Sequence, residues 1–378
     1  MNTVPTRRAV AGPRRLLHRL PLLVALVAAL AGIEPAVAPS PWGQLSAAPL
    51  GNAFPVGITL GPDGNLWFTE NAGIGRITPG GRITTFPAPD MVRIVPAAPM
   101  GGECPYCYER IVAGTDGNLY FTQRHAIGRM SVSGALTELA IRPDYGSLAN
   151  LIAGPDGALW FEAAPRHYHQ DGYIGRMTLG GHVTWFRRTP ALIPLDLAAG
   201  ADGQLWVTLP HELARMSTAG HLLARYPLPV GDRTCLPQCE PFKIIAGPDG
   251  NMWFTLWGTD AEIGRSTSAG KIAIYRLRSK DTGAPIALAA GHDGRVWFAK
   301  IWDHYIGAVT THGGIREFPV PGGVDNFPGI AAGSDGNIWF TEVCANSIGR
   351  ITPSGRFTSY HIPGTAARAG DWCLGAIT

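Results

Sequence analysis

The chain has 378 residues, 46% of them hydrophobic, and a formal charge of +3 at neutral pH. Five arginines and one glutamate lie within residues 1–38, so the remainder has 26 basic and 27 acidic side chains and a charge of about −1. This balance argues against a protein that binds phosphate backbones, and no nucleic-acid partner is expected. The length is ample for a large hydrophobic core.

Residues 1–38 have the features of a secretory signal. A basic region that includes Arg7 and Arg8 precedes an apolar run over Leu20 to Ile33, and the small residues at 36–38 form a cleavage site. The pattern predicts a signal peptide over 1–38 and a secreted or periplasmic protein. General secretion is favoured over a twin-arginine route. The apolar run is shorter than the roughly 20 residues of a membrane span, so an uncleaved anchor is the alternative. No span is expected after cleavage.

Most of the remaining chain is one repeated unit. The stretch GPDGNLWFTENAGIGRITPGGRITTF at 61–86 begins with a Gly-x-Asp-Gly head. That head returns six times, starting at Gly114, Gly154, Gly200, Gly247, Gly291 and Gly333. Spacings of 40–53 residues indicate a solenoid, a propeller or an array.

Each unit reads as four short strands. In the first copy these are 56–60, 66–69, 74–78 and 83–86, with an Asp63-Gly64 turn after the first strand. Four antiparallel strands with one tryptophan per unit are typical of a β-propeller blade. We therefore predict an all-β, seven-bladed β-propeller, as a single domain over 39–378 with repeats over about 54–362. The expected blades are roughly 54–88, 108–141, 149–188, 194–229, 241–278, 285–319 and 327–362.

The repeat separates scaffold from candidate function. A tryptophan, or Tyr120, occupies one position in every copy, and six copies carry an arginine at one position of the third strand. We expect the aromatic residues to pack blade against blade. We expect the arginines to form ion pairs or hydrogen bonds to the next blade. The Asp-Gly pairs are turn residues rather than metal ligands.

The loops after the tryptophan strands and the crossings between blades lie on one face of the disc and differ from copy to copy. This variable face carries the candidate site. The residue that closes the tryptophan strand is a glutamate in only two copies, Glu70 and Glu342. Blades one and seven are neighbours in a closed ring, and His304 and His125 would flank these carboxylates. Such a set can hold a divalent cation or transfer a proton. Solvated loop residues without a ligand are the alternative.

The chain contains six cysteines, which favour disulfides in an exported protein. We predict a Cys344–Cys373 bond that fixes the C-terminal tail. The Cys104/Cys107 and Cys235/Cys239 pairs are interpreted as two local loop staples. The alternatives are a zinc site shared by these four residues, or a redox pair at Cys104 and Cys107.

The heads GPDGNLWFTE, the IGRIT strands and the Gly-x-Ile-Thr-x-Phe strands resemble the streptogramin B lyase (virginiamycin B lyase) family over about 54–362. The resemblance implies a lyase that opens the ester bond of a cyclic depsipeptide by elimination. It also implies a histidine base and Mg²⁺ held by glutamates and a second histidine. Glu342 matches one metal-binding glutamate, and Asn326 replaces another. The two expected histidine positions are occupied by Ile286 and Pro328.

Two further functions remain open. One is a non-catalytic propeller that binds a protein, peptide or glycan, and the other is a metal-dependent lactone hydrolase of the gluconolactonase kind. For the leading hypothesis we expect Glu342 and Glu70 at Mg²⁺, His304 or His125 as base, and a small-molecule or peptide ligand at the mouth of the central channel. We expect a monomer.

Overall fold

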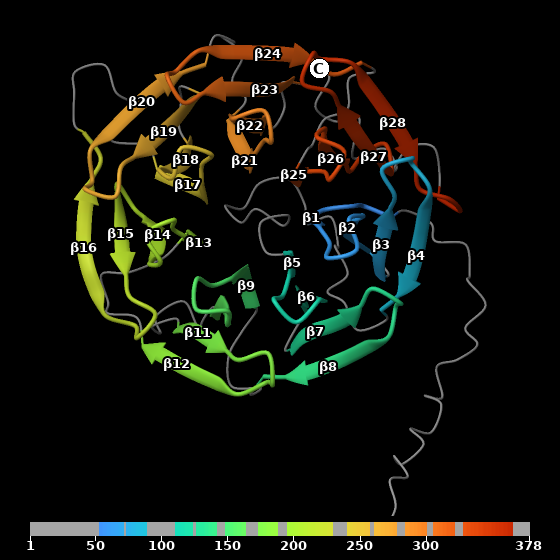
Figure 1. Cartoon of the computed structure of the whole chain (residues 1–378), viewed down its shortest axis with the longest axis horizontal. Helices are drawn as coiled ribbons and strands as arrows, with labels where there is room; N and C mark the ends of the chain where they lie inside the picture. The colour runs from blue at the N-terminus through green and yellow to red at the C-terminus, as the bar shows by residue number, and fades with distance from the viewer. Residues whose placement is uncertain are drawn as a thin grey trace, which may run out of the picture. The chain divides into compact units, whose positions relative to one another are not determined.

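The computed structural model is a ring of seven four-stranded sheets (Figure 1). It describes residues 53–71, 73–88, 110–123, 126–141, 148–163, 173–187, 195–229, 240–257, 261–277, 284–300, 305–321 and 328–365. All of these belong to one compact unit, Pro49–Thr378. The predicted seven-bladed, all-β propeller is therefore confirmed. The predicted signal at 1–38 lies outside the described residues and stays a prediction.

Within each blade the strands follow chain order and pair antiparallel, from the innermost to the outermost (Figure 1). The first strands are β1 (Ile58–Leu60), β5 (Ile111–Ala113), β9 (Leu148–Ala153), β13 (Asp196–Ala199), β17 (Glu240–Ala246), β21 (Pro285–Ala290) and β25 (Ile330–Ala332). The second strands are β2 (Leu66–Glu70), β6 (Asn118–Thr122), β10 (Leu159–Ala163), β14 (Leu205–Leu209), β18 (Met252–Trp257), β22 (Arg295–Lys300) and β26 (Ile338–Glu342).

The outer half of each blade has the same order. The third strands are β3 (Gly73–Ile77), β7 (Ala126–Ser131), β11 (Tyr173–Met177), β15 (Glu212–Met216), β19 (Glu262–Ser266), β23 (Tyr305–Thr310) and β27 (Ser347–Ile351). The fourth strands are β4 (Ile83–Pro87), β8 (Leu136–Ala140), β12 (Val183–Arg187), β16 (Leu222–Pro227), β20 (Ile272–Arg276), β24 (Ile315–Pro319) and β28 (Phe357–His361). No helix of the described residues is long and apolar enough to cross a membrane.

The Gly-x-Asp-Gly head is a turn that also anchors the tryptophan. In blade five, Gly250 has a φ of 72°, which a glycine adopts without steric cost. The Asp249 carboxylate accepts hydrogen bonds from Trp253 Nε1 at 2.9 Å and from Arg265 Nε at 2.7 Å. The aspartate thus holds the turn, the tryptophan and the arginine of one blade together.

The arginine array makes two kinds of contact. Ion pairs to the aspartate of the same blade recur around the ring, as in Arg176–Asp156 at 2.6 Å. Arg76 and Arg350 also donate to carbonyl oxygens of the following blade, at 3.1 Å in both cases. The expected hydrogen bonds to the next blade are present at these positions. The ion pairs lie within blades.

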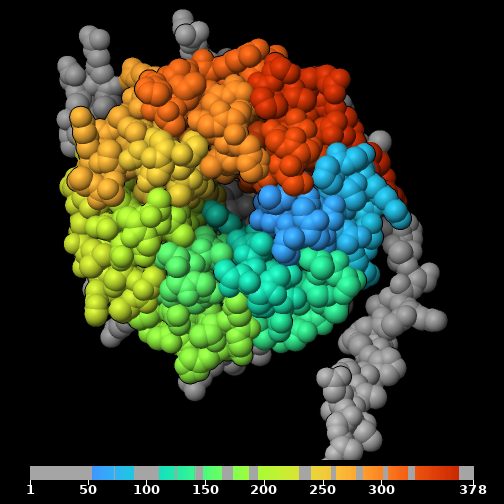
Figure 2. All heavy atoms as spheres, in the orientation of Figure 1, coloured from blue at the N-terminus to red at the C-terminus, as the bar shows by residue number. Residues whose placement is uncertain are grey.

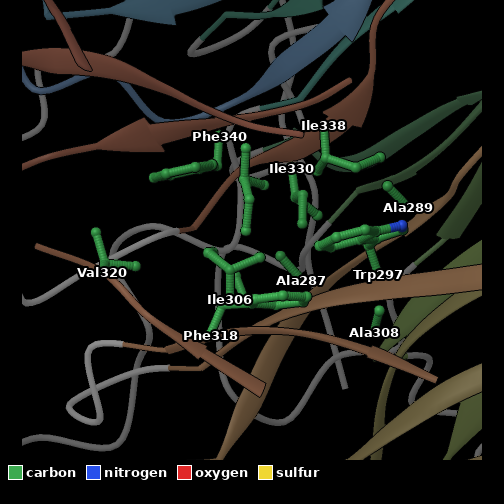
Figure 3. Close-up of a cluster of buried hydrophobic side chains, with 12 residues drawn as sticks. Ala287, Ala289, Trp297, Ile306, Ala308, Phe318, Val320, Ile330, Ile338 and Phe340 are labelled. Atoms are coloured by element: carbon green, nitrogen blue, oxygen red, sulfur yellow. The ribbon is translucent and has the colours of Figure 1, made fainter. Parts of the chain in front are cut away.

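The core lies between adjacent blades. In Figure 3, Trp297 of β22 and Phe318 of β24 lie beside Ile330, Ile338 and Phe340 of the next blade. The Trp297 and Phe318 rings stack with centroids 5.6 Å apart. Trp297 and Phe340 are fully buried. The expected blade-to-blade packing of the tryptophans is confirmed, and burial of this kind stabilises each interface.

Blade seven packs against blade one and closes the ring. Thr341 Oγ1 of β26 donates to the Val56 carbonyl at 3.1 Å. The Asn346 side-chain oxygen accepts from the backbone N–H of Ala53 at 2.9 Å and of Phe54 at 3.2 Å. These bonds join residues almost 300 positions apart. They place Glu70 and Glu342 on neighbouring blades, as the sequence predicts.

Candidate functional site

Glu70 and Glu342 are the last residues of β2 and β26, the second strands of blades one and seven. Both side chains are buried, with exposed fractions of 1% and 3%. The Glu342 carboxylate accepts a short hydrogen bond from the Ser359 hydroxyl on β28. Glu70 Oε2 has no hydrogen-bond partner in the described part of the chain. The two carboxyl groups are thus matched in position and differ in local bonding.

Burial raises the pKa of both glutamates to about 7. At Glu342 the Ser359 hydrogen bond opposes this rise, because it favours the charged carboxylate. Carboxyl groups with such pKa values hold or release a proton near neutral pH. Two groups of this kind at one end of the ring are candidates for a functional site.

The remaining predicted site residues are not placed. His304 and His125 lie outside the described residues, so their proposed role as base stays a prediction. Among the described residues, no group of three His, Cys, Asp or Glu side chains could hold a metal ion. The proposed site thus has two placed members, Glu70 and Glu342, on adjacent blades.

Cys344 follows β26 and is 6% exposed. It is disulfide-bonded. Its predicted partner Cys373 lies outside the described residues, as do Cys104, Cys107, Cys235 and Cys239. The pairing of all six cysteines therefore remains a prediction.

A cavity of about 200 Å³ occupies the central channel, where the blades surround a hollow in Figure 2. Several of its lining residues occupy one equivalent position, at or near the start of the first strand of a blade. Blades one, six and seven place Gly57, Ala287 and Gly329 there, and blades two and five place Arg110 and Lys243. The cavity is therefore lined by small residues on one side and by charged residues on the other.

The charged side is organised by Asp196, the first residue of β13. Its side chain is fully buried and accepts from Arg110 Nη2 at 2.5 Å and from the Ile244 backbone N–H at 3.0 Å. Arg110 comes from blade two, Asp196 from blade four and Ile244 from blade five. The ion pair thus joins blades two and four at the channel, and the Ile244 hydrogen bond adds blade five.

Lys243 lies beside this pair. Burial lowers its pKa to about 8, and the positive charge of Arg110 acts in the same direction. The carboxylates of Asp196 and Glu162 oppose the shift. In the described part of the chain, the nearest recorded partner of Lys243 Nζ is the Phe242 ring, 5.1 Å from it. The Lys243 side chain is therefore partly buried at the cavity, and its amine makes no hydrogen bond to a described residue.

The sequence analysis missed these channel residues, although the repeat contains the signal for them. The first strand starts with Val56-Gly57-Ile58 in blade one and with Pro328-Gly329-Ile330 in blade seven. Arg110, Asp196 and Lys243 replace that glycine in blades two, four and five. A charged residue at a position otherwise occupied by glycine or alanine departs from the repeat as clearly as Glu70 does.

Comparison with known proteins identifies relatives that match most of the chain. The profile of the virginiamycin B lyase family matches residues 97–375. No curated protein matches the chain. Among solved structures, the selenomethionine-substituted virginiamycin B lyase from Staphylococcus aureus is 25% identical, with a TM-score of 0.61 over 77% of this chain and 92% of that one.

One other solved structure shares the fold, and a second shows a weaker likeness. A catalytically inactive variant of the S. aureus virginiamycin B lyase, solved with quinupristin, is 24% identical, with a TM-score of 0.64 over 81% of this chain and 97% of that one. A gluconolactonase from Xanthomonas campestris is 14% identical, with a TM-score of 0.45 over 66% and 84%. The second likeness is too weak to bear on function.

Proposed function

Since the chain belongs to the virginiamycin B lyase family, we propose that it is an exported carbon–oxygen lyase that opens a cyclic ester or a related substrate. The observation that carries the proposal is Glu342. It occupies the position of the family's metal-binding glutamate and is a buried carboxyl whose pKa is raised to about 7. The substrate would enter at the mouth of the central channel on the variable face.

Glu342 and Glu70 fit Mg²⁺ in the chemistry of their donors. Carboxylate oxygens are the protein ligands that Mg²⁺ prefers, and the ion usually keeps several waters. Glu70 Oε2 is a buried oxygen with no hydrogen-bond partner among the described residues, so it has an acceptor site to offer. A bound Mg²⁺ would supply Lewis-acid polarisation of the ester. Two glutamates alone make an incomplete shell.

The proton acceptor is assigned to His304 or His125. In an eliminative opening, an imidazole takes a proton from the carbon next to the alkoxy carbon, and a double bond forms between the two. The ester oxygen then leaves with the bonding electrons as a carboxylate. No water enters the product, which separates this reaction from hydrolysis.

A second candidate function is a propeller that binds a small molecule or peptide without catalysis. The observation in its favour is the identity of Ile286 and Pro328, which occupy the family's histidine positions and cannot accept a proton. Binding at the channel would persist without these histidines, whereas lyase chemistry needs another base.

The experiment uses the secreted chain with quinupristin as probe, with Mg²⁺ and after chelation. Chromatography separates the opened ring, and its mass distinguishes elimination, which leaves the mass unchanged, from hydrolysis, which adds one water. Metal content is measured for the protein and for Glu342→Gln. The lyase proposal expects metal-dependent opening that is lost in Glu342→Gln and in one of His304→Ala or His125→Ala.

The exposed Glu138 on β8 supplies the matched control, Glu138→Gln. If the quinupristin ring opens equally fast after chelation, the reaction needs no metal ion, and that part of the proposal is wrong. A protein that takes up no Mg²⁺ and leaves the ring intact while binding quinupristin saturably would overturn the lyase and support the binding function.

A further inference from the structure

We propose that the central cavity is a binding site for a carboxylate, held by Lys243 and Arg110. The ligand is a small organic acid or the carboxyl end of a peptide. This site differs from the one at Glu70 and Glu342, neither of which lines the cavity. It needs no metal ion.

The arrangement of the first strands creates both the space and the charge. Gly57, Ala287 and Gly329 line one side with little or no side chain, whereas Arg110 and Lys243 line the other. An engineered apolar cavity of about 150 Å³ admits benzene, so the 200 Å³ here can hold a ligand of similar or slightly larger size. A carboxylate on such a ligand can reach the charged side.

The side chains of Arg110 and Lys243 bring spare hydrogen-bond donors to the cavity. Both oxygens of Asp196 already accept hydrogen bonds, from Arg110 and from the Ile244 backbone. A guanidinium has five N–H donors and an ammonium three. In the described part of the chain, Arg110 uses only Nη2 in a hydrogen bond, and Lys243 uses none. A ligand that completes this site must therefore bring acceptor oxygens.

Desolvation points to the same ligand. Lys243 is partly buried at the cavity, and the partial loss of solvation has a cost for the charged amine that lowers its pKa. A ligand carboxylate beside Lys243 would offset the cost and favour the charged amine. Asp196 is engaged with Arg110, and Glu162 on β10 is 6% exposed. Their charges already oppose the shift without removing it.

The test is calorimetric titration of the secreted chain with benzoate and with the tripeptide Ala-Ala-Phe, each beside its neutral amide. We expect saturable binding of at least one acid, at least tenfold tighter than its amide. Lys243→Met should weaken that binding at least tenfold, and Lys243→Arg should restore part of it. Lys271→Met, at an exposed lysine before β20, is the matched control. Tighter binding of benzoate would indicate a free organic acid as the ligand. Tighter binding of Ala-Ala-Phe would indicate the carboxyl end of a peptide.

A second measurement requires no variant. With ¹³C-labelled lysine, the pKa of Lys243 should rise above its ligand-free value when the acid is bound, and binding at pH 8 should take up protons. Equal affinity for acid and amide, no binding of either acid, or an unchanged Lys243 pKa on binding would overturn the proposal. Binding should persist in Glu342→Gln and after chelation, so the lyase proposal and this one can fail separately.

Discussion

The substitution Glu70→Gln should stabilise the protein above pH 7 and destabilise it by about 1 kcal/mol near pH 4. The buried Glu70 carboxyl has a pKa of about 7 against an ordinary value of 4.5. At 1.36 kcal/mol per pKa unit, the difference corresponds to about 3 kcal/mol. Because the folded-state pKa is the higher one, the contribution of Glu70 to the free energy of unfolding is greatest below pH 4.5. It then falls as the pH rises to 7.

Glutamine has nearly the same shape as glutamate and does not ionise. The free energy of unfolding of the variant therefore lacks the fall that Glu70 causes between pH 4.5 and pH 7. Its amide N–H groups need acceptors in a buried place, which reduces the expected gain at pH 8 to about 2 kcal/mol. The assay is urea unfolding at pH 4.5 and pH 8 in the presence of a chelator. Glu138→Gln, at an exposed carboxylate, is the control. A difference between Glu70→Gln and the wild type that is the same at both pH values would refute the reasoning.

Three further predictions concern the scaffold. Asp249→Asn should cost about 2 kcal/mol at pH 7, because it weakens charge-assisted hydrogen bonds that include the one from Trp253. The loss should shrink near pH 3, since these bonds hold the Asp249 pKa below 3.8 despite burial. Gly264→Ala should lower the melting temperature, since its Cβ would overlap a phenyl ring on the preceding strand, at a cost of about 1–3 kcal/mol. Non-reducing peptide mapping should recover Cys344 linked to Cys373, and a free thiol at both would contradict that pairing.

A stabilising Glu70→Gln would also bear on function. If the Glu70 carboxyl lowers the stability of the folded protein near neutral pH, stability does not explain its presence. A role in metal binding or proton transfer would explain it. If Mg²⁺ binds there, adding it should remove the advantage of the variant, because the ion favours the ionised glutamate.

The scaffold was predictable because each of its elements depends on local chemistry. The Asp63-Gly64 turn and the alternation of the strands recur within each copy, and a tryptophan, or Tyr120 in the second copy, follows the aspartate by four residues. The hydrogen bond from Trp67 Nε1 to Asp63 joins residues four positions apart. Such short-range rules need no knowledge of the ring, and seven repetitions make them visible in one sequence.

The channel was not predictable in the same way, because its contacts join distant blades. Arg110 and Asp196 are 86 positions apart and meet only when the ring closes. A search of second-strand ends finds Glu70 and Glu342, which are the glutamates of an otherwise variable position. The first-strand position behaves differently, since it is glycine in blades one and seven and alanine in blade six, and its exceptions in blades two, four and five carry charge. In a propeller these exceptions face one another across the axis, so the departures from glycine mark where a ligand can be held.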